Sequence, residues 1–285
     1  MRDPAAPPIL DRMTPKCVLA ALVALLVVAA PASAWAPADD ATVRPGVQTI
    51  TGGSNQCTAN FVFSDGATTY LGQAAHCSST GAANETNGCL AASMPLGTSV
   101  EIEDHRNPGE FPVRGTMVYN SWLTMQGVGD GDDSTCRYND FALVRLDNVG
   151  ADAVNPTIPF WGGPTGVTGS VPQLDDVFSY GNSSLRFGIQ QLKPKRGTNV
   201  QQIGNGWHYD VYTATPGIPG DSGSAFVDAS GRAFGVLSTL AAAPLPASNG
   251  VSDVSRAIAY MKAQTAFDGV SLQNGTEPFD PGRIL

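Results

Sequence analysis

The chain has 285 residues, with 16 Lys and Arg against 25 Asp and Glu, and a formal net charge of −9. So acidic a chain with so few cations is poorly suited to binding nucleic acid or an anionic membrane. Its 32 Gly and 21 Pro favour many short strands and turns over helices.

The N-terminal segment predicts export. Residues 1–12 resemble an upstream extension, and Lys16 then precedes an apolar run over residues 17–30 that ends in the small residues 31–34. This run is too short to span a bilayer and polar sequence follows it, so residues 1–34 are predicted to comprise the upstream extension and a secretory signal peptide. No later stretch is apolar enough to span. We therefore expect a secreted, soluble mature chain of roughly 250 residues.

Beyond residue 34 the sequence predicts a β-rich domain with one helix. Residues 35–48 predict a loosely held arm, and residues 127–134 an exposed loop rich in Gly and Asp. Near the C-terminus Ser252 is a candidate N-cap, and Val254, Ile258 and Met261 follow at helical spacing. The tail after residue 268 is expected to be irregular. Strands are predicted where short apolar segments alternate with polar turns, at residues 59–63, 68–71, 99–102, 141–146, 177–180, 208–213 and 233–238.

Four cysteines remain once the signal peptide, which carries Cys17, is removed. In an oxidising compartment Cys57, Cys77, Cys89 and Cys136 predict two disulfides, and the spacing leaves all three connectivities open. The chain has no CxxC pair and its histidines are scattered, so a zinc site is disfavoured. We expect no metal and no cofactor.

The stretch GIPGDSGSAF, residues 217–226, surrounds Ser222 with glycines. Such residues favour an ordinary surface turn, so a nucleophilic role needs further support. A serine nucleophile requires an adjacent base, most often histidine, which a third group orients. His105 lies in a charged loop and predicts a solvated side chain, whereas His208 begins a strand and predicts a packed or half-exposed one.

His76 and Asp140 are the candidates for base and orienting group. His76 follows a short apolar strand in YLGQAAHC, where a bridged Cys77 would fix its backbone. Asp140 precedes the buried-looking strand of YNDFALVRL, where a carboxylate is costly to desolvate unless it is paired. Taken alone, Asp140 could equally cap the strand.

The motifs AAHC, NDFALVRL and GDSGSAF occur in the order His, Asp, Ser, which is the chymotrypsin order. The nucleophile-elbow pattern GxSxG fails, because the second glycine comes one residue early. Over residues 48–267 the chain resembles a trypsin/chymotrypsin-type (family S1) secreted serine protease of the bacterial branch. The resemblance implies an all-β fold of two six-stranded antiparallel β-barrels with a C-terminal helix.

By this resemblance, residues 49–268 form the protease domain and residues 269–285 a tail. The first barrel would cover about 49–150, the second about 151–250 and the helix about 252–266. The resemblance implies His76, Asp140 and Ser222 as the catalytic triad, with the N–H groups of Gly220 and Ser222 as the oxyanion hole. It also implies a Cys57–Cys77 disulfide beside the histidine, which leaves Cys89 with Cys136.

The chain departs from the family at the specificity pocket and at the activation site. Pro216 replaces the aspartate of trypsin-type members, and Ser238, Thr239 and Leu240 stand at the pocket wall, so we expect cleavage after small or apolar residues. Ile50 lies too close to Cys57 for a freed N-terminus to reach Asp221. An internal cation is therefore expected to pair with Asp221, and the candidates are Arg145 and Arg186.

Two rival functions remain open at this stage. An inactive relative could bind proteins or peptides, although no triad residue is missing, and the same triad could hydrolyse small esters. For the endopeptidase we expect protein or peptide substrates, no nucleic-acid or membrane partner, and a monomer.

Overall fold

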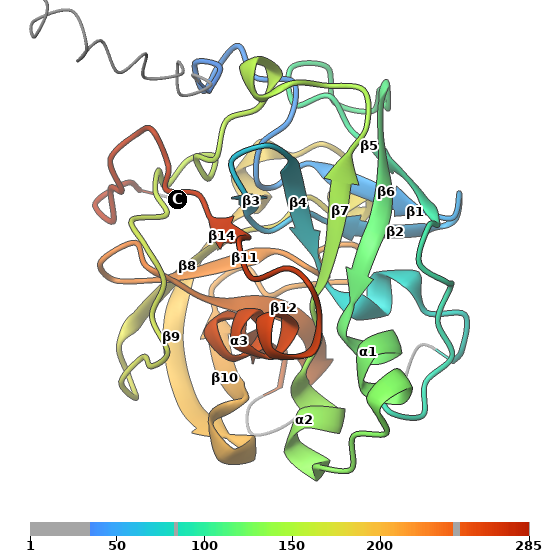
Figure 1. Cartoon of the computed structure of the whole chain (residues 1–285). Coiled ribbons are helices and arrows are strands. Elements are labelled where there is room, and N and C mark those ends of the chain that lie inside the picture. The colour runs from blue at the N-terminus through green and yellow to red at the C-terminus, as the bar shows by residue number, and fades with distance from the viewer. Residues whose placement is uncertain (1–34, 83–84, 242–245, 285) are drawn as a thin grey trace, which may run out of the picture. The chain divides into compact units, whose positions relative to one another are not determined.

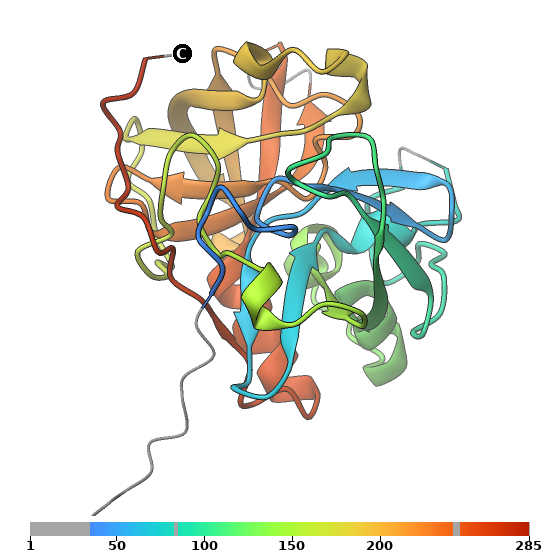
Figure 2. The ribbon, with the colours of Figure 1, turned by 90° about the horizontal axis from the view of Figure 1, so that it is seen from above.

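The computed structural model describes residues 35–82, 85–241 and 246–284. The predicted signal peptide, residues 1–34, lies outside these described residues. Two antiparallel β-sheets account for most of the fold, and Figures 1 and 2 show their strands as a blue-to-green group, joined by the red β14, and a yellow-to-orange group. None of the helices in the described ranges is long and apolar enough to cross a membrane.

The second half of the chain forms a closed six-stranded barrel with the strand order β10-β13-β12-β11-β8-β9. The all-β class and this barrel are as the resemblance implied. Aromatic and branched apolar side chains fill it, including Phe226, Phe234 and Val251. Its strands are β8 (Asp176–Tyr180), β9 (Pro194–Ile203), β10 (His208–Thr213), β11 (Ala225–Asp228), β12 (Ala233–Ala241) and β13 (Ser248–Asp253).

The first half forms an eight-stranded sheet rather than a six-stranded barrel, with the order β14-β3-β4-β7-β6-β5-β1-β2. It gains strands at both ends: β2 pairs with β1 in a hairpin, and β14 arrives from the C-terminal tail to pair with β3. Its strands are β1 (Gln48–Thr51), β2 (Asn55–Thr58), β3 (Val62–Ser64), β4 (Thr69–Gln73), β5 (Ser99–Ile102), β6 (Val113–Asn120), β7 (Ala142–Leu146) and β14 (Ser271–Leu272).

Three α-helices accompany the sheets in the described ranges, and two of them were not predicted. The helix α1 (Ser121–Val128) begins at Asn120, whose side chain accepts the N–H groups of Trp122 and Leu123. The short helix α2 (Asp133–Tyr138) starts inside the segment expected to be a loop, because Asp132 caps it. The predicted C-terminal helix is α3 (Val254–Gln264), but its N-cap is Asp253, which accepts from the Arg256 N–H.

Both ends of the described chain are held more firmly than the sequence suggested. In the arm, Ala36, Ala41 and Val43 are buried, and the Ala36 N–H donates to the Val154 carbonyl at 3.0 Å. In the tail, β14 extends the first sheet, and Phe279 packs edge-on against Phe178 of the barrel with ring centroids 5.3 Å apart. The tail, drawn in red in Figure 2, therefore contacts both halves of the fold.

Candidate active site

Ser222 lies in the turn that connects β10 to β11. The Asp221 N–H donates to Ile218 O within the turn at 2.9 Å, and the Gly223 N–H donates to Leu237 O of β12 at 2.7 Å. Gly220 and Gly223 adopt φ angles of +94° and +88°, a region that strains residues with a side chain. The glycines of GDSGS therefore serve this backbone conformation.

The first sheet holds this turn through Thr58 at the end of β2. Its N–H donates to Ser222 O at 2.8 Å, and its hydroxyl donates to Gly220 O at 2.8 Å. The nucleophile candidate is thus fixed by a strand that lies more than 160 residues earlier in the chain.

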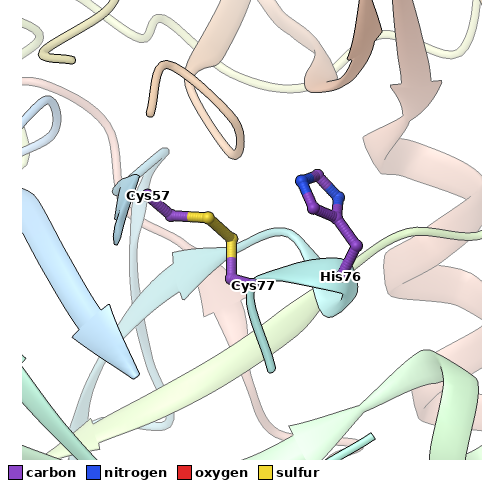
Figure 3. A group of neighbouring side chains, drawn as sticks. All are labelled: Cys57, His76 and Cys77. Atoms are coloured by element: carbon purple, nitrogen blue, oxygen red, sulfur yellow. A yellow bond between two sulfur atoms is a disulfide. The ribbon is translucent and has the colours of Figure 1, made fainter. Parts of the chain in front are cut away.

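His76 belongs to a short 3₁₀ turn, Ala75–Ser78, that follows β4. The next residue, Cys77, forms a disulfide with Cys57, and Figure 3 shows the disulfide and the imidazole projecting side by side. The ligand atoms of these three residues lie within 4.8 Å of one another. Because the disulfide ties up both sulfurs, no thiolate is available to hold a metal there.

Asp140 meets His76 through both of its oxygens. Oδ1 accepts the His76 N–H at 2.9 Å, and Oδ2 lies 2.7 Å from His76 Nδ1. The Ser238 hydroxyl of β12 also donates to Oδ2, at 2.5 Å. This arrangement leaves Nε2 of the imidazole pointing away from the carboxylate, as a general base requires.

Opposite electrostatic effects act on this pair. Burial would lower the pKa of His76, but the charge of Asp140 and its hydrogen bond outweigh burial and raise that pKa above 6.5. Burial would raise the pKa of Asp140, yet the attraction of His76 and the hydrogen bonds from His76 and Ser238 lower it below 3.8. The pair therefore favours an ionised carboxylate that stabilises an imidazolium.

His76, Asp140 and Ser222 line one cavity of about 640 Å³. Within the described chain, no hydrogen bond joins the Ser222 hydroxyl to His76, and the N–H groups of Gly220 and Ser222 donate to no protein acceptor. In enzymes without substrate, catalytic hydrogen bonds are often long, so this geometry is compatible with a resting site.

One end of the cavity corresponds to the expected specificity pocket. Ser238, Thr239 and Leu240 line it, whereas Pro216 does not and instead offers its carbonyl to Arg186 Nη2 at 2.8 Å. Asn249 also lines the cavity, although no motif in the sequence indicated it. Asn249 accepts from the Gly217 N–H at 2.7 Å and donates to Thr239 O at 3.2 Å, so it joins two walls of the pocket.

Asp221 is fully buried and pairs with two cations. Arg186, one of the predicted candidates, contacts it through Nη2, and Lys195 Nζ lies 2.9 Å from Oδ2. The candidate Arg145 was wrong, because it is half-exposed and pairs with Asp147. Lys195 was missed, since a lysine within a strand usually indicates a solvent-facing position.

Asp221 and Lys195 experience this cluster differently. Burial alone would raise the pKa of Asp221, but the bonds and charges of Arg186 and Lys195 lower it. Burial and repulsion from Arg186 lower the pKa of Lys195 to about 8, despite the attraction of Asp221. Arg186 already neutralises the charge of the Asp221 carboxylate, so Lys195 adds a second buried positive charge to the cluster.

The remaining histidines lie outside the cavity. His208 is buried beside Tyr138, with ring centroids 4.6 Å apart. This agrees with the packed or half-exposed side chain predicted from its place at the start of a strand. His105 is half-buried rather than solvated, because it contacts Arg44 Nη1 at 3.3 Å. Burial and the charges of Arg44 and Lys193 lower the pKa of His105 to about 4.

The second cysteine pair, Cys89 with Cys136, joins residues 47 positions apart. Together with Cys57–Cys77, the pair that the resemblance implied, it gives the two disulfides that were predicted. The bridge connects the loop before β5 to α2, so both disulfides belong to the first half of the chain.

No protein-family model and no curated protein matches this sequence. Solved structures do match. Thermobifida fusca protease A superposes on 82% of this chain and 100% of its own, with 17% identity and a TM-score of 0.52. A glutamic acid-specific serine protease that uses a novel histidine triad in substrate binding covers 81% of this chain and 100% of its own, with 18% identity and a TM-score of 0.50. The chain thus has the fold of the bacterial chymotrypsin-like serine proteases.

Proposed function

We propose that the chain is a serine endopeptidase that works through a Ser222–His76–Asp140 triad. The observation that supports this most is the two-point contact of Asp140 with His76 on the wall of the cavity that also holds Ser222. A carboxylate that grips both the backbone and the ring of a histidine fixes its tautomer and orientation, as a triad requires.

In the proposed reaction, Ser222 Oγ attacks the peptide carbonyl carbon while His76 Nε2 takes the hydroxyl proton. The tetrahedral intermediate carries its negative charge on the former carbonyl oxygen, which the N–H groups of Gly220 and Ser222 stabilise. His76 then gives its proton to the leaving amine, and the acyl-enzyme forms. Water, activated by the same histidine, releases the acid and restores Ser222.

The pocket supports a preference for small or apolar residues on the acyl side of the cleaved bond. Ser238, Thr239 and Leu240 offer no charge to a basic or acidic side chain, and the Asn249 carboxamide is occupied by the pocket walls. Among the described lining residues, His76 is the one histidine. The cavity therefore gives no support for recognition of glutamate by several histidines.

Export supports the same proposal. Two disulfides persist in oxidising compartments, and the N-terminal segment predicts a secretory signal, so we propose a secreted, monomeric enzyme that acts on protein or peptide substrates.

The test is covalent labelling of Ser222 with an organophosphorus serine reagent, together with cleavage-site profiling on a mixed peptide pool. We expect labelling and peptide cleavage by the disulfide-intact protein, and loss of nearly all cleavage in Ser222→Ala and His76→Ala. Absence of both labelling and cleavage would favour an inactive binding protein. Faster turnover of small esters than of matched peptides, with no internal peptide cleavage, would favour a small-ester hydrolase.

A further inference from the structure

The proposed oxyanion hole depends on the orientation of two peptide groups. The Gly220 N–H belongs to the Pro219–Gly220 peptide, and the Ser222 N–H belongs to the Asp221–Ser222 peptide. In a planar trans peptide the N–H and C=O bonds point in opposite directions. Whatever holds the carbonyl of such a peptide therefore also aims its N–H.

The Asp221–Ser222 peptide is held from within its own turn. The Asp221 carbonyl accepts the Ser224 hydroxyl at 2.5 Å and the Ser224 N–H at 3.0 Å. Both donors come from a residue three positions later in the same turn, so the local sequence is sufficient to orient the Ser222 N–H.

The Pro219–Gly220 peptide is held differently. The Pro219 carbonyl accepts the Ser183 hydroxyl at 2.6 Å, and within the described chain no other donor reaches it. Ser183 is 2% exposed and lies between β8 and β9, in a loop separate from the turn that it contacts. The orientation of the Gly220 N–H thus depends on a distant side chain.

Glycine leaves this peptide free to flip, so an external bond can select its orientation. Gly220 adopts φ of +94° in the turn that the Asp221 N–H closes on Ile218 O, and glycine also permits the turn form in which the Pro219–Gly220 peptide is flipped. A Cβ on Gly220 would lie 2.8 Å from Ser183 Oγ. The absence of a side chain at residue 220 therefore lets the serine hydroxyl approach the peptide closely.

Ser183 also connects this peptide to the buried ion cluster. Its N–H donates to Asp221 Oδ1 at 3.0 Å, and Arg186, three residues later, pairs with the same carboxylate. One short segment, residues 183–186, thus supplies both the cation for Asp221 and the hydroxyl for the Pro219 carbonyl.

We propose that Ser183 is a positioning residue that aims the Gly220 N–H into the oxyanion hole. This inference rests on the proposed function. Without the hydroxyl, the Pro219–Gly220 peptide rotates away in part of the molecules, and one of two oxyanion donors is lost there. Since the donor acts on the charge of the transition state, its loss lowers kcat and leaves KM nearly unchanged.

The test compares Ser183→Ala and Ser183→Gly with the unchanged protein and with Ser184→Ala. Glycine is tolerated at the helix-capping position that Ser183 occupies, so Ser183→Gly separates loss of the hydroxyl from loss of the cap. Ser184 is the matched control, because its hydroxyl bonds Gln56 and not the nucleophile turn. Circular dichroism and thermal melting verify that each variant is folded.

Two ligands with the same peptide sequence, chosen from the cleavage profile, provide the decisive measurement. A peptide aldehyde forms a tetrahedral adduct with Ser222 whose oxygen occupies the oxyanion hole, whereas the corresponding peptide alcohol binds without forming that bond. Removing one oxyanion donor costs about 10²- to 10³-fold in kcat. For partial rotation we expect kcat and aldehyde affinity to fall by about 10- to 100-fold in both Ser183 variants, with alcohol affinity and KM changed by less than about threefold.

Unchanged kcat and aldehyde affinity in both variants would overturn the role of Ser183, and so would an equal loss of affinity for the aldehyde and the alcohol. Labelling of Ser222 in the unchanged protein separates this result from failure of the proposed function. An unlabelled, inactive protein would refute both proposals, whereas a labelled, active protein with unaltered variants would refute only the positioning role.

Discussion

Lys195→Met tests the physical account of the buried ion cluster. The Lys195 side chain is fully buried beside Asp221, which Arg186 already neutralises. Methionine preserves most of the apolar stem and removes the ammonium group. Because Arg186 remains, the variant leaves Asp221 paired, and the usual penalty for an orphaned buried charge does not arise.

The size and sign of the effect follow from the pKa of Lys195. Its fall from 10.5 to about 8 on folding corresponds to about 3 kcal/mol, at about 1.36 kcal/mol for each pH unit. Between pH 8 and pH 10.5 the unfolded chain binds this proton and the folded chain does not, so the free energy of unfolding rises with pH. Below pH 8 the buried ammonium opposes folding by the full amount.

The assay is urea unfolding followed by tryptophan fluorescence at constant ionic strength, in a Ser222→Ala background that prevents self-digestion. We expect Lys195→Met to be at least as stable as its parent at pH 7, and we expect the difference in free energy of unfolding to shift by about 3 kcal/mol in favour of the parent by pH 10.5. Lys262→Met, on the half-buried face of α3, serves as the control for a general effect of lysine removal. Parallel stability curves for Lys195→Met and its parent across this range would refute the reasoning.

Three further predictions concern the site and its support. Because Asp140 raises the pKa of the imidazole it contacts, the acid limb of kcat/KM lies above pH 6.5; Asp140→Asn should move that limb to lower pH and reduce kcat by about 10⁴, and an unmoved limb would contradict the pairing. Replacing Cys57 and Cys77 by alanine opens a loop with a separation of 20 residues and should lower the free energy of unfolding by roughly 3 kcal/mol in denaturant titrations, together with peptidase activity. Because Ile50 of β1 pairs with β2 on one side and β5 on the other, a chain of residues 35–285 should be active without further cleavage. Activity assays run in parallel with N-terminal sequencing test this, and activity that appears only after a cut before Ile50 would disprove it.

The sequence was informative wherever apolar spacing or a motif marked a position. Strands such as β5 and β10 have the predicted bounds, and the motif residues His76, Asp140 and Ser222 gather at one cavity. Their catalytic role stays a prediction. The specificity pocket was harder to predict from the sequence, because the Asn249 side chain bonds to backbone groups and no motif indicates such contacts.

Other features left no signal in the sequence for physical reasons. The arm is buried through small side chains such as Ala36 and Ala41, which produce no hydrophobic periodicity. The helix α2 has only six residues and is mostly polar, so it shows no apolar periodicity, and its N-cap residue Asp132 was the one sign of a helix. Lys195 and Ser183 matter through partners far away in the chain, and no local pattern reveals such a contact.

The C-terminal tail bears on how the two halves of the fold resist local opening. By pairing with β3 it covers a sheet edge that would otherwise offer free N–H and C=O groups to another extended chain. Its Gly275 N–H donates to Pro164 O, and the Gly163 N–H donates back to Glu277 O, so the segment is tied to the connection between the two halves. Opening of one half therefore also breaks contacts that the tail makes with the other half, so a peptidase acting on its own copies would meet fewer locally opened segments.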